Sequence, residues 1–223
     1  MSRVLVIGDT HCPTMLPEYV DFLGETYDSW DCDRVVHIGD LVDNCALSFH
    51  TKKPHLKDPE AEYETAMEQV AQLTSLFPAA DLMIGNHDAL PWRLCDEVGI
   101  PYEMMRDPAQ IWNLPDKWTV HDRFEQCIID GVIYQHGDCG KSSAKLNMLA
   151  EFCSVVQGHH HSKFFVEYGA NRNSRTFGMQ VGCGVDRKHA AMEYGKKFNT
   201  KPILGCGVVL DGTHAYNEPM ILS

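Results

Sequence analysis

Short apolar runs that end abruptly in polar residues are the feature that most restricts the fold of this chain. Residues 3–7 and 34–38 have the valine- and isoleucine-rich composition of buried strands, and each run ends in a Gly-Asp pair. Between them, residues 18–27 show the apolar spacing of a helix. Two strands joined by a helix form a βαβ unit, in which parallel strands bring their carboxyl ends to one sheet edge. The sequence therefore predicts an α/β fold with polar side chains gathered along that edge.

Three later strand patterns end in the same way. They lead into Gly85-Asn86-His87-Asp88, Gln135-His136-Gly137-Asp138 and Gly158-His159-His160-His161. Successive side chains of an extended chain point to opposite sides, so His159 and His161 face one way and His160 the other. Imidazoles, carboxylates and an amide would be costly to bury together unless they bind cations. Their nitrogen and oxygen atoms are typical ligands of Mn, Fe, Zn or Co and less typical of Mg or Ca.

The remaining segments fit one domain over residues 1–223, because the chain shows no repeat, low-complexity segment or long linker. A long helix is predicted from Asp58-Pro59 to about residue 77, since aspartate suits the N-cap and proline the first helical position. Prolines divide residues 89–116 into short helices and loops, and this segment is a candidate small lid.

The second half of the chain shows hairpin signals and one amphipathic helix. The predicted hairpins lie around Asp130-Gly131, between residues 163–168 and 175–181, and between residues 206–210 and 215–222. The helix spans residues 142–152, with Leu146, Leu149 and Phe152 on one apolar face.

The ordered motifs Asp-x-His, Gly-Asp-x-x-Asp, Gly-Asn-His-Asp, His and Gly-His-x-His occupy residues 8–161. In this order they resemble the calcineurin-like metallophosphoesterase superfamily. The resemblance implies a four-layer αββα sandwich, in which two mixed β-sheets are flanked by helices and the site lies at the strand ends. It also implies two divalent or trivalent metal ions, Mn, Fe or Zn, with Co or Ni as substitutes in vitro.

The resemblance assigns a role to each strand-end residue. It implies seven metal ligands: Asp9, His11 and His161 for the first metal, Asn86, His136 and His159 for the second, and Asp40 as the carboxylate that bridges both. His87 matches the histidine that contacts the phosphate and assists the leaving group, and Asp43 matches the acid that orients it.

The reaction implied by this resemblance is the hydrolysis of phosphate esters. A metal-bridging hydroxide attacks phosphorus in line, and protonated His87 donates to the leaving oxygen without a covalent enzyme intermediate. The protein Ser/Thr phosphatases of this superfamily carry an arginine after the second acid, where this chain has Asn44. This difference favours a small phosphodiester or nucleotide-type substrate, with Asn44, His50 and Arg93 as candidate substrate-binding residues.

Charge and composition limit the alternatives. The formal net charge of −12 argues against nucleic acid as a partner, since phosphate backbones are bound by basic surfaces. The alternatives are a phosphomonoesterase, including a protein Ser/Thr phosphatase, and a metal-dependent nuclease. A non-catalytic scaffold of the retromer type is less favoured, because every matched ligand position is filled. We see no signal peptide and no apolar run near the ~18 residues of a membrane span, so we expect a cytoplasmic protein without membrane contact.

Nine cysteines are present, with no Cys-x-x-Cys pair. An odd number without metal-binding spacing favours reduced, mostly buried thiols. Cys12, Cys45 and Cys139 adjoin candidate ligands, so a role for a thiol near the site is a less favoured alternative.

Single residues also have simpler interpretations. Asp43 could cap a helix, and His87 could be a structural neighbour of the ligands. His50 could belong to a solvated charge cluster with Lys52, Lys53 and His55, and Arg93 to a surface salt bridge. We expect Asp88 to hold its turn, and the tryptophans at 92, 112 and 118 to pack in the core rather than wall a pocket. The other histidines are predicted to lie in the core (His37), in an exposed position (His160) or on the surface (His121, His189 and His214).

Overall fold

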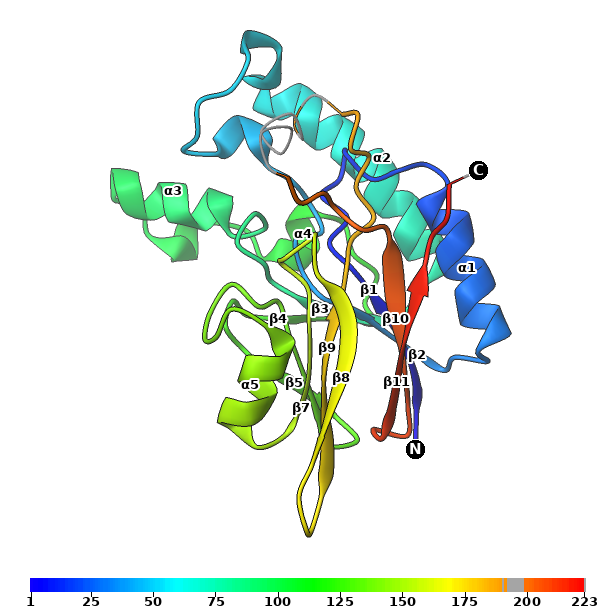
Figure 1. The fold of residues 1–223 in the computed structure, drawn as a ribbon. Coiled ribbons are helices and arrows are strands. Elements are labelled where there is room, and N and C mark those ends of the chain that lie inside the picture. Colours follow the sequence, from blue (N-terminus) through cyan, green and yellow to red (C-terminus); the bar gives the residue numbers. More distant parts are fainter. Residues whose placement is uncertain (190, 192–198, 223) are drawn as a thin grey trace.

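Two mixed β-sheets face each other in the computed structural model, which describes residues 1–189, 191 and 199–222 (Figure 1). The first sheet has the strand order β11 (His214–Pro219), β10 (Gly205–Leu210), β1 (Arg3–Ile7), β2 (Arg34–His37), β3 (Ala80–Met83) and β4 (Trp118–His121). The second has the order β5 (Cys127–Ile129), β6 (Val132–Gln135), β7 (Ser154–Gln157), β9 (Arg175–Val181) and β8 (Phe164–Ala170).

Both sheets combine parallel and antiparallel strand pairs. Strands β1 to β4 pair in parallel, and β10 joins β1 in antiparallel orientation. In the second sheet β6, β7 and β9 are parallel, while β5 and β8 are antiparallel edges. The three predicted hairpins are therefore confirmed. The carboxyl ends of β1, β2, β3, β6 and β7 carry the polar motifs of the sequence.

Helices complete four layers (Figure 1). α1 (Tyr19–Ser29) and α2 (Pro59–Leu76) pack on the outer face of the first sheet through a core that includes Leu23, Leu73 and Leu82. α5 (Ala144–Glu151) covers the second sheet through Met148. A separate core fills the space between the sheets, where strand alternation places every second side chain. The predicted αββα sandwich is thus the observed architecture.

The long helix α2 begins as the sequence predicts. The Asp58 carboxylate accepts hydrogen bonds from the backbone N–H groups of Glu60 and Ala61, and proline occupies the first turn. These contacts satisfy donors that a helix start would otherwise leave unpaired. Two short 3₁₀ helices, η1 (Cys45–Leu47) and η2 (Pro54–Leu56), lie in the loop before it.

The predicted apolar face of α5 was wrong. Leu146, Leu149 and Phe152 are 43%, 54% and 90% exposed, respectively, whereas Asn147 faces the sheet. Asn147 donates a 2.7 Å hydrogen bond to Gln157 on β7 and a second one to the Lys141 carbonyl. These polar bonds set the rotation of the helix, which a pattern based on apolar spacing cannot detect.

Residues 89–116 contain α3 (Leu90–Val98), η3 (Tyr102–Met104) and α4 (Pro108–Ile111). Trp112 of this segment is buried in the core, and the Trp92 ring packs edge-on against it at 6.4 Å. Trp118 is also buried and donates its indole N–H to the Phe77 carbonyl. The tryptophans therefore pack in the core as predicted, whereas the lid role of the segment stays a prediction.

Two further expectations concern the whole chain. All nine cysteines are free thiols. Within the described ranges, none of the helices combines the length and the apolar character that crossing a membrane requires.

Candidate dimetal site

The structure gathers all seven predicted ligands at the carboxyl ends of the strands. Two groups of three can each hold a metal ion, since one ligand atom from every member lies within 4.8 Å of the others. They are Asp9, His11 and His161, which we term the first cluster, and Asp40, His136 and His159, which we term the second cluster. Asn86 lies beside the second cluster, with its Oδ1 3.1 Å from His136 Nε2.

Unusual backbone conformations aim these side chains. His11, Asp40 and His159 have φ values of 47°, 51° and 62°, in the left-handed region that non-glycine residues rarely adopt. Such strain persists only where the surrounding structure enforces it, and it is typical of functional sites. A Cβ at Gly158 would collide with the Asp9 carboxylate, and one at Gly85 with the Asp40 carboxylate. The glycines therefore let the chain pass directly behind the two acids.

The ligand atoms of the first cluster are arranged as in a metal site. His161 Nε2 lies 3.0 Å from Asp9 Oδ2 and 3.1 Å from His11 Nε2. His11 Nδ1 is 2.8 Å from Asp43 Oδ1, so its N–H donates to that carboxylate and leaves the Nε2 lone pair directed into the cluster. A carboxylate behind the ring is the usual way of fixing a metal-binding histidine.

The second cluster is built in the same way with a different partner. His136 Nδ1 donates to the Ile38 carbonyl at 3.1 Å, which leaves Nε2 facing Asp40 Oδ2 at 3.2 Å. The same Asp40 oxygen lies 3.5 Å from His11 Nε2 in the first cluster. One carboxylate thus stands between the two groups, as a bridging ligand must.

His87 lies beside both clusters. Its Nδ1 is 2.7 Å from the Asp43 carbonyl oxygen and 3.2 Å from the Asp43 carboxylate, and its backbone N–H donates to Asp40. The structure thus brings Asp43 to both His11 and His87. With Nδ1 held in this way, Nε2 of His87 remains for another partner. His87 also groups with His11 and Asp40 closely enough to serve as a ligand itself.

Buried charges pair strongly in this site. Burial lowers the pKa of His136 and His87, but the hydrogen bonds and charges of nearby aspartates outweigh it and raise both to about 10. Burial raises the pKa of Asp40, yet His136 and the neighbouring histidines hold it well below its ordinary value. Without a cation the site is therefore stabilised by carboxylate–imidazolium pairs, and a bound metal would displace protons from the histidines.

The three candidate substrate-binding residues have different environments. Asn44 donates a hydrogen bond to the His87 carbonyl, so its side chain already supports the site. His50 and Arg93 line a cavity of about 290 Å³ that opens beside Asn86 and His87. Phe49, which sequence reasoning missed, also lines it, and the Arg93 guanidinium lies 5.2 Å above the Phe49 ring. An aromatic residue in a loop next to His50 was the only signal for it.

Asp88 and His37 support the site from behind. Asp88 accepts hydrogen bonds from the backbone N–H groups of Val42 and Gly85, the turn-holding role that we predicted. Burial and the Asp40 charge raise its pKa to about 7. His37 is a buried core histidine, as predicted, and contacts Thr10 Oγ1 and the Gly39 N–H.

Two histidine predictions were wrong. His160 is half-buried rather than exposed, because its ring packs 4.9 Å from that of His159. His121 is not a surface residue, since only 15% of its side chain is exposed and it pairs with Asp81. Cys12, Cys45 and Cys139 belong to none of the candidate metal clusters found among the described residues.

The strand-end position and the shared carboxylate define a candidate dinuclear metal site. Comparison with known proteins agrees, because a family model for calcineurin-like phosphoesterases matches residues 2–185, well over half of the chain. The chain therefore belongs to the calcineurin-like phosphoesterase family, whose members depend on two metal ions.

Individual relatives are distant. The chain is 27% identical to the Gene 54 protein of Mycobacterium phage D29 over 244 aligned residues, 97% of this chain and 92% of that protein. Among solved structures, Yfce, a phosphoesterase from E. coli, is 13% identical with a TM-score of 0.42, covering 92% of this chain and 90% of that one. Vacuolar Protein Sorting 29 from Cryptosporidium parvum is 16% identical with a TM-score of 0.46, covering 98% of both chains.

Proposed function

We propose that this protein hydrolyses small phosphodiesters or nucleotide-type phosphate esters at the strand-end site. The observation that carries the proposal is Asp40, whose carboxylate lies 3.2 Å from His136 in one cluster and 3.5 Å from His11 in the other. Two metal ions held by these ligands, Mn, Fe or Zn by the chemistry of the donors, would activate water and offset the charge of the phosphate.

The surrounding residues have separate roles in this proposal. Asp9, His11 and His161 would hold the first metal, and Asn86, His136 and His159 would hold the second. His87 donates a proton to the leaving oxygen from Nε2, because its Nδ1 is occupied by Asp43. In the metal-free protein the hydrogen bonds and charges of Asp43 and Asp40 raise the pKa of His87 to about 10, so these acids favour the protonated ring that a general acid needs.

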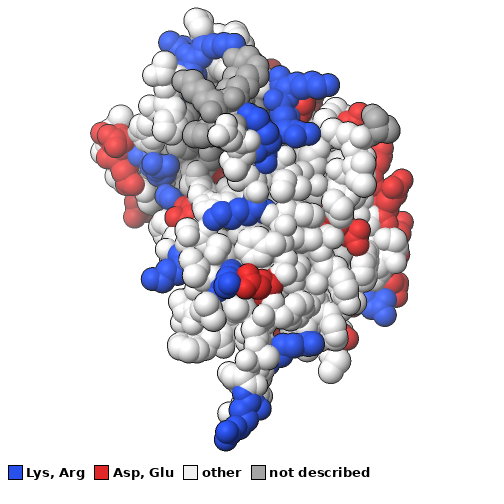
Figure 2. Space-filling view, viewed as in Figure 1, with Lys and Arg blue, Asp and Glu red and all other residues white. Residues whose placement is uncertain are grey.

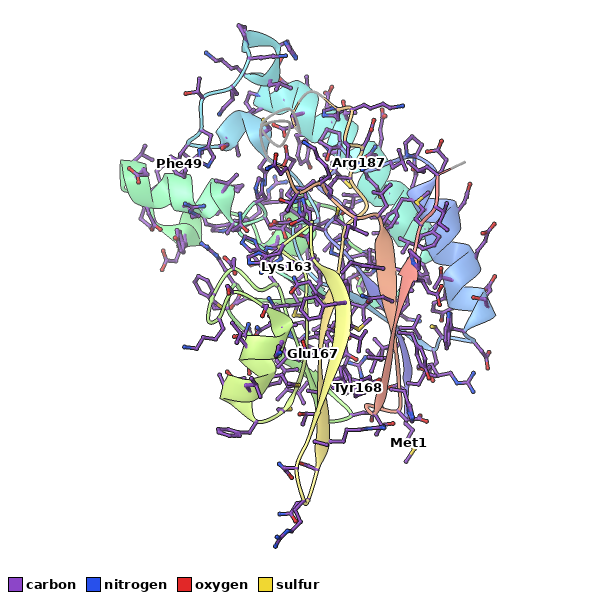
Figure 3. All side chains as sticks on the ribbon, viewed as in Figure 1. Met1, Phe49, Lys163, Glu167, Tyr168 and Arg187 are labelled. Carbon is purple, nitrogen blue, oxygen red and sulfur yellow. The ribbon has the colours of Figure 1, made fainter. Side chains whose placement is uncertain are left out.

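The cavity beside His87 supports the preference for a diester with a planar group. A leaving group protonated by His87 would enter the space lined by Phe49, His50 and Arg93. The Phe49 ring, which Figure 3 labels near α3, offers a stacking surface, and Arg93 offers a fixed positive charge. We further propose that residues 89–116 act as the wall of this cavity and as its lid, since α3 carries Arg93.

A nuclease is the second candidate, favoured by one feature of the surface. Lys and Arg side chains are frequent on the face shown in Figure 2, although the net charge is −12. Lys163, which follows the ligand His161 by two residues, and Arg187 lie on this face. A locally basic surface would permit contact with a phosphate backbone.

The test is a parallel assay of the purified protein loaded with Mn²⁺, using bis-p-nitrophenyl phosphate, p-nitrophenyl phosphate, cyclic nucleotides and single-stranded DNA. We expect the diester and the nucleotides to be the best substrates by kcat/KM. Preference for the monoester would indicate a phosphatase, and preference for DNA a nuclease. If none is hydrolysed with Mn, Co, Ni, Zn or Fe, the enzyme proposal is wrong and a scaffold role takes its place.

A further inference from the structure

A third group of ligand side chains lies outside the dimetal site. It contains Asp81 of β3, His121 of β4 and Cys127 of β5, and one ligand atom from each lies within 4.8 Å of the other two. None of the three belongs to the first or second cluster. We term this group the edge cluster, because β4 and β5 are the outermost strands of their respective sheets.

Strand register turns the three side chains toward each other. Asp81 lies two residues before Met83, so both side chains point to the same face of β3, and Met83 belongs to the core between the sheets. His121 is paired with Met83 across the first sheet. Cys127 enters the same core from the second sheet. The edge cluster therefore lies at the rim of the layer where the two sheets meet.

Arg34 occupies one oxygen of the Asp81 carboxylate, and the other oxygen faces His121 within the edge cluster. Arg34 donates from Nε and Nη2 to Asp81 Oδ2, at 3.1 and 2.9 Å. Asp81 Oδ1 lies 3.0 Å from His121 Nε2. The other ring nitrogen, His121 Nδ1, is 3.7 Å from the Glu125 carboxylate. Carboxylates often stand behind metal-binding histidine rings, and Glu125 lies on that side of His121, beyond direct hydrogen-bond distance.

We propose that Asp81, His121 and Cys127 bind one zinc ion through Oδ1, Nε2 and Sγ. Thiolate, imidazole and carboxylate together suit Zn²⁺, and three protein ligands leave a fourth position for water. On binding, the Cys127 S–H bond breaks and its proton leaves to solvent as the Zn–S bond forms. In the metal-free network His121 Nε2–H donates to Asp81 Oδ1; on zinc binding this proton leaves Nε2, and the neutral ring carries its proton on Nδ1, facing Glu125. Charges balance, since the positive zinc and Arg34 offset Asp81, Glu125 and the thiolate.

The state of the thiol fits this proposal. Burial raises the pKa of Cys127 to about 11, and the Asp81 charge adds to the effect. The thiol is thus protonated in the absence of a cation, and only a metal would make it a thiolate. The Asp81 and His121 side chains are 12% and 15% exposed, respectively, so an ion can reach them. A zinc ion here would tie together the edge strands of the two sheets.

Cobalt titration of the full-length protein after chelation tests the edge cluster without any use of activity. A cobalt–thiolate absorption band in the near ultraviolet is expected, with a final amplitude that corresponds to one thiolate-bound cobalt ion per chain. The first and second clusters offer only nitrogen and oxygen ligands, so they cannot give this band. Cys127→Ser should abolish it, and Glu125→Gln should weaken cobalt affinity by roughly 10-fold or more. Cys153→Ser is the matched control, because that thiol lies outside the clusters and donates to the Gly131 carbonyl.

Absence of the thiolate band in the wild-type protein, or its persistence in Cys127→Ser, would overturn the proposal. If Cys127→Ser fails to fold, His121→Gln replaces it and must lose the band. Zinc content by mass spectrometry gives a second readout, with one ion fewer in His121→Gln than in the wild type. Equal zinc content would mean that Asp81, His121 and Cys127 form only a hydrogen-bonded ion-pair network with Arg34.

Discussion

The strand-end ligand site and the cavity beside it adjoin each other but are stabilised in different ways. In the ligand site, second hydrogen bonds fix the rings of His11 and His136, and the acids are almost fully buried. In the cavity wall, Phe49 is 52% exposed, and its loop is held by Lys52, which donates to the carbonyls of Ala46 and Ser48. The proposed chemistry therefore belongs to the rigid strand ends, and the proposed substrate choice to an exposed loop and helix.

The largest effect is expected at Asp40, the residue on which both clusters depend. Asp40→Asn keeps the shape and tolerates the left-handed backbone, but it removes the charge that faces His11 and His136. Activity should fall at least about 10³-fold, with loss of metal from both clusters. Metal content and kcat/KM measure this, with the exposed Asp116→Asn as control. Retention of both metals in Asp40→Asn would show that Asp40 does not bridge.

His87→Ala should separate chemistry from metal binding. Activity is expected to fall by about 10²- to 10³-fold, the usual contribution of a general acid, while both metals stay bound. The loss should be smaller for p-nitrophenyl esters, because their leaving group needs little protonation. Since His87 also groups with His11 and Asp40, metal content must be measured beside the rate. Loss of one metal would make His87 a ligand and not a proton donor.

These two predictions concern the region that the sequence revealed best. Strand ends, βαβ connections and motif order located every candidate ligand, because parallel strands necessarily bring their carboxyl ends together. The rotation of α5 was not predictable, since it depends on hydrogen bonds from Asn147 to partners distant from the helix face. The burial of His121 was missed for a similar reason, because it results from the packing of two edge strands from different sheets. Phe49 lies in a loop without periodicity, so no pattern pointed to it.

The dependence of stability on pH should distinguish the buried strand-end ligand site from the exposed cavity wall. His37 accepts a hydrogen bond from the Gly39 N–H at Nδ1 and contacts Thr10 at Nε2, an arrangement that requires the neutral ring. Burial lowers its pKa from 6.5 to about 4. As the pH falls below 6.5, His37 is protonated in the unfolded chain before it is protonated in the folded protein. The neutral His37 ring therefore contributes its full stabilisation above pH 6.5, and this stabilisation is lost as the pH falls toward 4.

The loss amounts to roughly 3 kcal/mol, from the difference between the two pKa values. Urea unfolding of the chelated protein at pH 8 and at pH 4.5 measures it, with His37→Gln as the comparison. The variant should lose less stability than the wild type over this range. The same slope in both proteins would exclude His37 as the source. His50→Gln, in the exposed loop, is the matched control and should behave as the wild type does.

The smallest effect is expected from a substitution at Phe49, which changes the cavity wall and not the strand-end ligand site. Phe49→Ala removes the stacking surface but should keep the fold, because half of the side chain is exposed. For a substrate with a nucleoside leaving group, kcat/KM should fall by about 5- to 10-fold, which corresponds to roughly 1 kcal/mol of aromatic stacking. For a methyl ester of the same phosphate, it should change little, since a methyl group cannot stack. Arg93→Lys, which keeps the charge but loses the planar guanidinium over the ring, should show part of the same selective loss. An equal loss of kcat/KM on both substrates would mean that Phe49 and Arg93 act on the strand-end ligand site itself. The division between a catalytic site at the strand ends and a cavity wall that selects the substrate would then be wrong.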